Sequence, residues 1–497
     1  MRCRLAIIDT ALLLAAALAL AACSSQANEG AVTVAVIGDA DDPHETGTRL
    51  SYAGQLVREA TAAGLVAMDG QGQVVPAIAE RWIVTEDGTS YFFRIRSSSW
   101  PDGEKLNAAT VRDALRRAIR AYDGTTLGLD LAKIAEIRVM AERVVEVRLK
   151  SPMPEFLQLL SQPELALRRD GSGTGPMVRV EDQPEDAPLR LSPLPPELRG
   201  LPQQRGFADS ALDVVVRGLP AAEAVEAFKR GEFEVVLGGD LTTLPLADVG
   251  PLSSGTLRLD AGLGLFGIVF RNRDGLLETP ERREALSMAI DRARLIESFN
   301  VSGWTPTSLL VPLGLPDDRG TRVERWDGQS LEQRRIMAAQ RIAGWAGASG
   351  EAPVLTIDLP PGPGSTPLFN RLAADFATIG VRLLRARPDR PADLMLIDRL
   401  ARYADARWFL NQFNCDVARP LCSPDADVLV DRSLIASSFA EASGQLAGAE
   451  AALTEAEVFI PLGTPIRWSL VRGGVGGYAE NRWARHPLFP MAIAPIS

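Results

Sequence analysis

Hydrophobic residues recur along the whole chain with two alternating periods. The run at 31–37 (AVTVAVI) is apolar at almost every position, which predicts a strand buried on both faces. Helical spacing follows at about 50–62 and again at 221–230, and a strand-like run at 354–359 precedes a helical run at 368–379. Strands that alternate with helices in both halves of the chain predict an α/β architecture.

The most distinctive local unit runs from Gly64 to Tyr122. Alternate residues from Tyr91 to Ile95 are apolar and share one face of a predicted strand. The Asp-Gly dipeptide at 87–88 predicts a two-residue hairpin turn with positive φ at both central positions. Asn107 can cap a helix, because apolar residues recur at helical spacing after it. The unit is therefore a hairpin, a loop and a helix.

The succession of motifs in this unit carries a family resemblance. The segments GLVAMDGQGQVVPAIAERW at 64–82 and DGEKLNAATVRDALRRAI at 102–119 occur in one order. That order resembles the signature of extracytoplasmic solute-binding proteins of the peptide/nickel class (bacterial family 5), which deliver ligands to ABC importers. The resemblance implies an α/β, two-lobed periplasmic-binding-protein-like fold of class II, with an extra subdomain in the first lobe. It also implies ligand capture by closure of the lobes, without covalent chemistry.

The same resemblance divides the chain into successive parts. We expect a lipoprotein signal peptide at 1–22, a tether at 23–30, a first lobe at 31–250 with a subdomain inserted at about 64–165, a second lobe at 251–464 and a return to the first lobe at 465–497. One departure stands at the start of the subdomain. Many relatives carry an aromatic and an acidic residue directly before the Gly-Leu pair, whereas this chain has Ala62 and Ala63.

Composition and charge exclude several classes of function. The chain has 497 residues, 46% of them hydrophobic and 23% charged, as a soluble globular protein of two or three domains does. Its net charge of −10 argues against a nucleic-acid partner, because no basic tract exists to replace phosphate counterions.

Catalytic and cofactor motifs do not fit either. The only histidines, His44 and His486, lie in unlike contexts, and neither a G-x-S-x-G elbow, an H-E-x-x-H pair nor a P-loop is present. Residues 262–267 (GLGLFG) match G-x-G-x-x-G, but the β-branched and aromatic run at 268–270 follows where a dinucleotide site needs a helix. We therefore expect no enzyme, no cofactor and no metal site.

The N-terminus resembles a lipoprotein targeting segment. Arg2 and Arg4 precede an apolar run at 11–22 that is short for a membrane span, and the run ends in the box LAAC at 20–23. Cys23 would then be the lipidated first residue of a protein held at the membrane, in the periplasm or cell envelope. The alternative is an ordinary signal peptide with an incidental cysteine.

The remaining cysteines support export. Cys3 leaves with the predicted signal, so Cys415 and Cys422 remain, and two nearby thiols outside the cytoplasm are expected to form a disulfide. A metal site is the competing interpretation, which the lack of a nearby histidine disfavours.

The segment from Asp393 to Cys415 resembles the part of the second lobe that faces the ligand in the family. Arg402 stands where peptide-binding relatives carry the aspartate that pairs with a ligand's amino terminus. A guanidinium suits a carboxylate or phosphate and does not suit a cationic amine. Two explanations stay open: the ligand is something other than a peptide, an anion for instance, or Arg402 is a surface residue in a degenerated site.

Four further residues are candidates for ligand contact. Asp405 matches the family pattern within the segment from Asp393 to Cys415. The aromatic residues offer apolar surface on which a ligand can stack, and core packing is the alternative interpretation for each of them. The candidates are Tyr403, Asp405, Trp408 and Trp304.

These observations predict a lipid-anchored, extracytoplasmic solute-binding component of an ABC importer. Its expected partners are a small-molecule or peptide ligand, the permease subunits of the importer and, through the lipid, the membrane. We expect a monomer. The alternative from another class is a ligand sensor or an envelope scaffold on the same fold, with a degenerated site and no role in transport.

Overall fold

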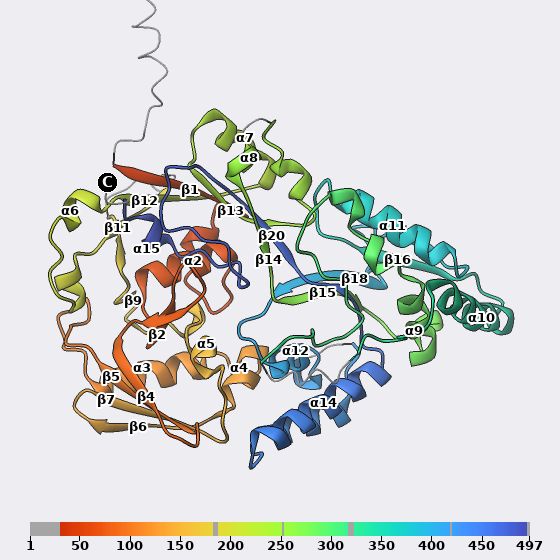
Figure 1. Ribbon diagram of the computed structural model, residues 1–497, viewed down its shortest axis with the longest axis horizontal. Coiled ribbons are helices and arrows are strands. Elements are labelled where there is room, and N and C mark those ends of the chain that lie inside the picture. The colour runs from red at the N-terminus through yellow and green to blue at the C-terminus, as the bar shows by residue number, and fades with distance from the viewer. Residues whose placement is uncertain (1–29, 182–186, 251–252, 317–322, 418–419, 495–497) are drawn as a thin grey trace, which may run out of the picture.

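The computed structural model describes residues 30–181, 187–250, 253–316, 323–417 and 420–494. Within them the chain forms two large sheets flanked by helices (Figure 1), which confirms the predicted α/β fold class. The predicted signal peptide and Cys23 lie outside the described residues, as does the tether except for Gly30. None of the described helices is long and apolar enough to cross a bilayer.

The first sheet has seven strands in the order β10-β11-β12-β1-β13-β20-β14. The strands are β1 (Ala31–Ile37), β10 (Met177–Arg179), β11 (Leu189–Pro193), β12 (Asp213–Leu219), β13 (Val235–Asp240), β14 (Leu257–Ala261) and β20 (Ile466–Val471). The central strand β1 pairs in parallel with β12 and β13. Because both of its faces are covered, both carry apolar residues, as the sequence predicted.

Helices cover the two faces of this sheet. Successive side chains of a strand point to opposite faces, so Val34 packs in the core on the side of α2 (Tyr52–Thr61), while Ala35 packs on the side of α7 (Ala221–Arg230). Both helices occur where the hydrophobic pattern predicted them. The shorter helices of this part are α6 (Phe207–Ser210), α8 (Ser253–Thr256) and α15 (Leu488–Met491).

A four-stranded antiparallel sheet, in the order β4-β5-β7-β6, forms the centre of the subdomain. Its elements are β4 (Ala79–Val84), β5 (Ser90–Ile95), β6 (Ile134–Ala141), β7 (Val144–Leu149), α3 (Ala108–Arg120), α4 (Thr126–Leu131) and α5 (Phe156–Leu160). Two strand pairs flank them, β2 (Val66–Met68) with β3 (Val74–Pro76) and β8 (Arg168–Arg169) with β9 (Ser172–Gly173). Tyr91, Phe93 and Ile95 are buried, and the side chain of Asn107 caps α3, both as predicted.

The turn between β4 and β5 differs from the predicted one. The backbone N–H of Gly88 donates to the carbonyl of Thr85 at 2.9 Å, and of the Asp-Gly pair only Gly88 has a positive φ, 67°. The prediction of positive φ at both positions is therefore wrong. The carboxylate of Asp87 accepts from the backbone N–H of Thr89 at 3.0 Å, which stabilises a four-residue loop in its place.

The second sheet has five strands in the order β17-β16-β18-β15-β19. The strands are β15 (Gly264–Phe270), β16 (Val354–Asp358), β17 (Arg382–Arg385), β18 (Leu394–Leu400) and β19 (Phe459–Gly463), and the helices of this part are α9 (Pro280–Ala289), α10 (Leu331–Ser349), α11 (Ser365–Ala377), α12 (Ala406–Asn411), α13 (Pro424–Ser433) and α14 (Phe439–Glu455). The G-x-G-x-x-G match falls on β15, which is buried throughout and pairs with β18 and β19. It is a strand of the core, as expected.

The chain passes between the two sheets after β14 and again before β20. These two strands pair with each other antiparallel and lie side by side at the centre of Figure 1. The lobe boundaries drawn from the sequence stay a prediction. Strand β14, which follows residue 250, pairs within the first sheet.

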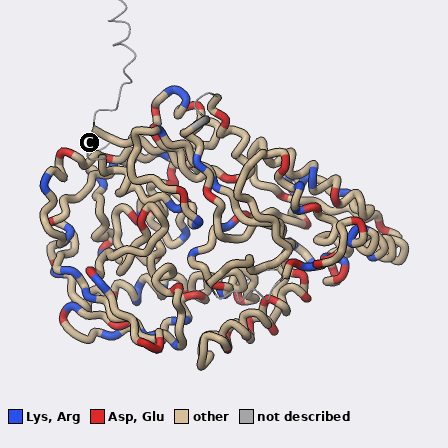
Figure 2. Tube along the Cα trace, in the orientation of Figure 1, with Lys and Arg blue, Asp and Glu red and all other residues tan. Residues whose placement is uncertain are grey.

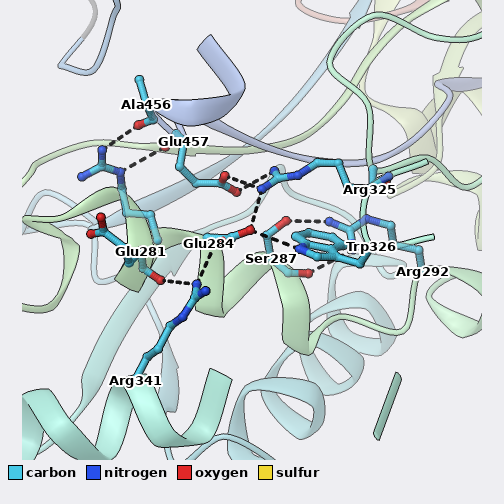
Figure 3. A network of polar contacts seen from close by, with 11 residues as sticks. Glu281, Glu284, Ser287, Arg292, Arg325, Trp326, Arg341, Ala456 and Glu457 are labelled. Carbon is cyan, nitrogen blue, oxygen red and sulfur yellow. Dashed lines mark hydrogen bonds and ion pairs between the residues drawn. The ribbon is translucent and has the colours of Figure 1, made fainter. Parts of the chain in front are cut away.

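A network of ion pairs holds the outer part of the second lobe together (Figure 3). The guanidinium of Arg325 forms two parallel contacts with the carboxylate of Glu457, at 3.0 and 2.8 Å, and a third with Glu284 at 3.2 Å. Arg341 contacts the other oxygen of Glu284 at 2.6 Å. Burial raises the pKa of Glu457, although Arg325 opposes the shift. The network joins α9, α10 and the segments before α10 and β19.

Cys415 and Cys422 form the predicted disulfide, with their Cα atoms 5.2 Å apart. Replacing both with serine should lower the free energy of unfolding by about 2–3 kcal/mol, because the bond closes only a short loop in the unfolded chain. The lobe should remain folded. Urea unfolding with and without a reducing agent measures the effect. A reductant that lowers the stability of the double variant as much as that of the wild type would contradict this assignment.

Candidate ligand-binding cleft

A cavity of about 500 Å³ lies where the first sheet, the subdomain and the second lobe meet. Its lining comes from all three parts and from the C-terminal segment. Among its lining residues are Tyr52, Gln55, Asp240, Arg467 and Ser469 of the first lobe, Met68, Thr126, Gln162 and Glu164 of the subdomain, Arg399, Arg402, Trp408 and Gln412 of the second lobe, and Trp483, Arg485 and His486 near the C-terminus. This volume lies within the range of about 300–1,000 Å³ that small-molecule sites occupy.

Arg402 lines this cavity in an ion pair with a carboxylate of the subdomain. Its Nη2 lies 3.1 Å from Oε1 of Glu164, whose side chain is only 6% exposed. Burial alone would lower the pKa of Arg402, but Glu164 and Asp130 together outweigh it, so the pKa lies above its ordinary value. The pair carries no net formal charge. Position 402 itself carries no carboxylate, but Glu164 of the subdomain places one directly beside it.

Four residues of the lining have a buried polar atom without a hydrogen-bond partner among the described residues: Glu164 (Oε2), Trp408 (Nε1), Arg485 (Nη1) and His486 (Nδ1). The first two belong to the subdomain and the second lobe. Oε2 of Glu164 can accept and the indole Nε1 of Trp408 can donate, so together they present both kinds of group. Trp408 lies on α12 and is 1% exposed, with its ring packed edge-on against Phe409 at 4.8 Å between centroids. A buried donor and acceptor without partners favour a ligand that supplies the complementary groups.

The other three sequence-predicted candidates are not part of the lining of this cavity. The hydroxyl of Tyr403 donates to Asp130 at 2.8 Å, and its ring is fully buried. Asp405 caps α12 by accepting from the backbone N–H of Arg407 at 2.7 Å. Trp304 packs on Gly463 in the second lobe. Their contact with ligand stays a prediction.

The subdomain and the second lobe also meet through backbone groups beside the cavity. The side-chain amide of Gln162 donates to the carbonyl of Arg402 at 2.8 Å, and the backbone N–H of Ala404 donates to Oε1 of Gln158 at 3.0 Å. These bonds fix the chain that carries Arg402 against the subdomain. On this side of the cleft, the subdomain and the second lobe are therefore in direct contact.

Two further arginines of the lining, Arg467 and Arg485, form ion pairs. Arg467 lies 2.7 Å from Asp398, and Arg485 lies 2.8 Å from Glu59. Burial raises the pKa of Asp398, and Arg467 opposes the shift. His486 lies 2.9 Å from Asp260, and no group of three metal-ligating side chains occurs in the described part of the chain. The arrangement can bind a polar molecule.

Sequence reasoning missed Glu164 and the basic residues of β20 and the C-terminal segment. No motif marks them, because Glu164 lies in a short 3₁₀ helix, Pro163–Leu165, that follows the subdomain helices. Arg467 sits in the return strand, whose alternation predicts only burial. The apolar context of Glu164, between Pro163 and Leu165, is the one available signal.

Comparisons with known proteins agree with this architecture. The family model of bacterial extracellular solute-binding proteins, family 5 (middle), matches residues 73–187. A probable di/tripeptide-binding protein of Pseudomonas aeruginosa is 24% identical over 85% of this chain and 88% of its own length. A probable deoxycholate-binding periplasmic protein of Escherichia coli is 34% identical over 22% of this chain and 26% of its own length.

Solved structures show the same fold. OppA of Haemophilus influenzae, crystallised with the peptide RPPGFSPFR, superposes with a TM-score of 0.76 at 16% identity, over 94% of this chain and 99% of that protein. The murein tripeptide binding protein MppA of Escherichia coli superposes with a TM-score of 0.77 at 16% identity, over 95% and 99%. The predicted two-lobed fold is confirmed. The match at 73–187, together with these relatives, supports assignment of the chain to the bacterial extracellular solute-binding proteins of family 5, a family of solute-binding proteins and not of enzymes.

Proposed function

We propose that the protein is the solute-binding component of an ABC importer and captures a small peptide-like ligand between its two lobes. The observation that carries this proposal is the unpartnered pair in the cavity, Oε2 of Glu164 and Nε1 of Trp408, at the contact between the lobes. A relative that covers most of the chain is named a probable di/tripeptide-binding protein, which supports the same class of ligand.

The chemistry of the cavity favours a ligand with an amine. Oε2 of Glu164 can accept from an ammonium group, while Oε1 is already occupied by Arg402. The indole N–H of Trp408 can donate to a ligand carbonyl. An anionic ligand held by Arg402 is the competing possibility, and it would have to displace Glu164 from the guanidinium.

A Glu164→Gln variant distinguishes the two ligand classes, because it should lower the affinity for one class and raise it for the other. An amine held by Glu164 should bind about tenfold or more weakly, since a charge-assisted bond contributes about 1.5–3 kcal/mol. An anion held by Arg402 should bind more tightly, because the variant releases the guanidinium from its partner. Native mass spectrometry first identifies what the purified protein retains from a random tripeptide library. Calorimetry then compares that tripeptide, its N-acetylated form and succinate.

Glu226→Gln is the matched control, because this glutamate pairs with Lys229 on the exposed face of α7 and should leave affinity unchanged. Failure of the purified protein to retain any tripeptide or anion would reject solute capture. That result would favour the alternative role of a sensor or envelope scaffold with a degenerated site.

We also propose that Cys23 carries a lipid that holds the protein at the membrane, facing outside the cytoplasm. A Cys23→Ser variant should move to the soluble fraction and should not incorporate labelled fatty acid. Cell fractionation and radiolabelling measure both effects. An unmodified protein that is itself soluble and unlabelled would show the anchor to be wrong, and leave an ordinary signal peptide as the explanation of the N-terminal pattern.

A further inference from the structure

A second cavity, of about 300 Å³, lies wholly within the first lobe and its subdomain. It is bounded by the end of α2, the β2–β3 pair, the 3₁₀ helix Pro196–Arg199 and the C-terminal segment at 485–490. It shares only Met68, Gln162 and Arg485 with the lining of the cleft. Nothing from the second lobe lines it, so lobe closure is not required to form it.

Small apolar side chains leave this space open. Ala62 and Ala63 line it, at the position where the sequence departs from its relatives. Ala67 of β2 also lines it, and so does its cross-strand partner Val75 of β3. Leu488 and Phe489 contribute further apolar surface from the C-terminal segment. Most of the lining is therefore suited to a hydrocarbon.

Two arginines of the lining have no carboxylate partner among the described residues. Arg96 donates from Nη1 to the backbone carbonyl of Arg199 at 3.2 Å, and the guanidinium of Arg199 lies 4.7 Å from the centre of the Phe489 ring. The Nε atoms of both arginines are buried without a hydrogen-bond partner. Burial lowers the pKa of Arg96, and the charge of Arg199 lowers it further.

This arrangement costs free energy unless a ligand compensates it. Two like charges lie near each other in a partly desolvated place, and each keeps a donor unsatisfied. Three more buried polar atoms without a hydrogen-bond partner belong to residues of the same lining: Oγ1 of Thr174, Nη1 of Arg485 and Oε1 of Glu59, a carboxylate oxygen that lies 2.8 Å from Nη2 of Arg485 in an ion pair. An anionic group would compensate the charges and accept from these donors, since guanidinium groups bind carboxylates in a fixed fork geometry.

We propose that this cavity is a second ligand site, which binds an apolar carboxylate. Its charged group would lie at Arg96 and Arg199, and its hydrocarbon against the two alanines that follow α2 and the alanine of β2. The site is separate from the cleft that captures the transported solute. Because Arg485 lines both cavities, the two sites are neighbours.

Calorimetry with decanoate tests the proposal, and decanol, which has a similar chain and no charge, is the comparison ligand. The wild type should bind one molecule of decanoate, and its affinity for decanol should be at least tenfold lower. Arg96→Met combined with Arg199→Met should weaken decanoate binding tenfold or more. Ala67→Leu should also weaken it, because the added side chain fills the cavity, and this variant keeps the test valid if the double variant does not fold.

Arg94→Met is the matched control, since this arginine lies on β5 two residues before Arg96, is exposed and pairs with Glu80. It should leave decanoate binding unchanged. Equal binding of decanoate and decanol would overturn the proposal, as would full affinity in the Ala67→Leu variant. Loss of decanoate binding in a Trp408→Ala variant would place the carboxylate in the cleft, and would likewise overturn it.

Discussion

Replacing Arg325 with methionine is expected to lower the free energy of unfolding of the second lobe by about 3–5 kcal/mol. Arg325 is the partner of Glu457, whose side chain is only 2% exposed, and it also contacts Glu284 (Figure 3). Removing the guanidinium leaves the carboxylate of Glu457 buried without a counterion. The cost of that buried charge, more than the lost attraction, sets the size of the effect.

Urea unfolding of the variant measures this loss. Arg230→Met is the matched control, because it removes the same group from an exposed pair with Glu232 and should leave stability almost unchanged. Adding Glu457→Gln to Arg325→Met should recover part of the loss. The loss should also be smaller at pH 5 than at pH 8, because protonation neutralises Glu457, whose pKa is already raised by burial. Equal losses for Arg325→Met and Arg230→Met would contradict the argument.

Local signals predicted the elements of the fold well. The strand at 31–37, the helix that begins after Asn107 and the helix at 221–230 follow from hydrophobic period and capping alone. The turn at Asp87 did not follow, because its carboxylate bonds to Thr89 and stabilises a longer loop than the Asp-Gly pair suggests. Side-chain hydrogen bonds of this kind depend on neighbours that a dipeptide rule ignores.

The composition of the cleft could be predicted only in part. The ungapped segment around Arg402 and Trp408 led to two residues that line the cavity. Its electrostatics could not be predicted, because Glu164 lies 238 positions away and reaches Arg402 only through the packing of the subdomain on the second lobe. A charge at one aligned position does not fix the charge of a site when another part of the chain can supply the counterion. Figure 2 shows acidic and basic residues interspersed over the whole described trace, so residues of opposite charge from distant parts of the chain can meet.

The stability of the chain should depend on pH through Asp130. This residue of α4 is fully buried where the subdomain meets the second lobe, and it accepts from Tyr403 at 2.8 Å and from Asn411 at 2.7 Å. Burial raises its pKa from 3.8 to about 6, against the opposing effects of Asn411, Arg407, Tyr403 and Arg402. The folded chain therefore binds this proton more tightly than the unfolded chain does. The stabilisation is fully present below pH 3.8 and is lost as the pH rises through about 6.

The difference between these two pKa values corresponds to about 3 kcal/mol. Asp130→Asn removes the titration, so the wild type should lose about 2.4 kcal/mol relative to this variant between pH 4 and pH 7, because at pH 4 part of the unfolded-state titration has already occurred. Urea unfolding of both proteins across that range measures the change, since the other titrating groups are common to both and cancel. Asp123→Asn, an exposed substitution nearby on the subdomain, is the matched control for the Asp-to-Asn change itself. A difference between wild type and Asp130→Asn that stays constant across this pH range would refute the predicted titration of Asp130.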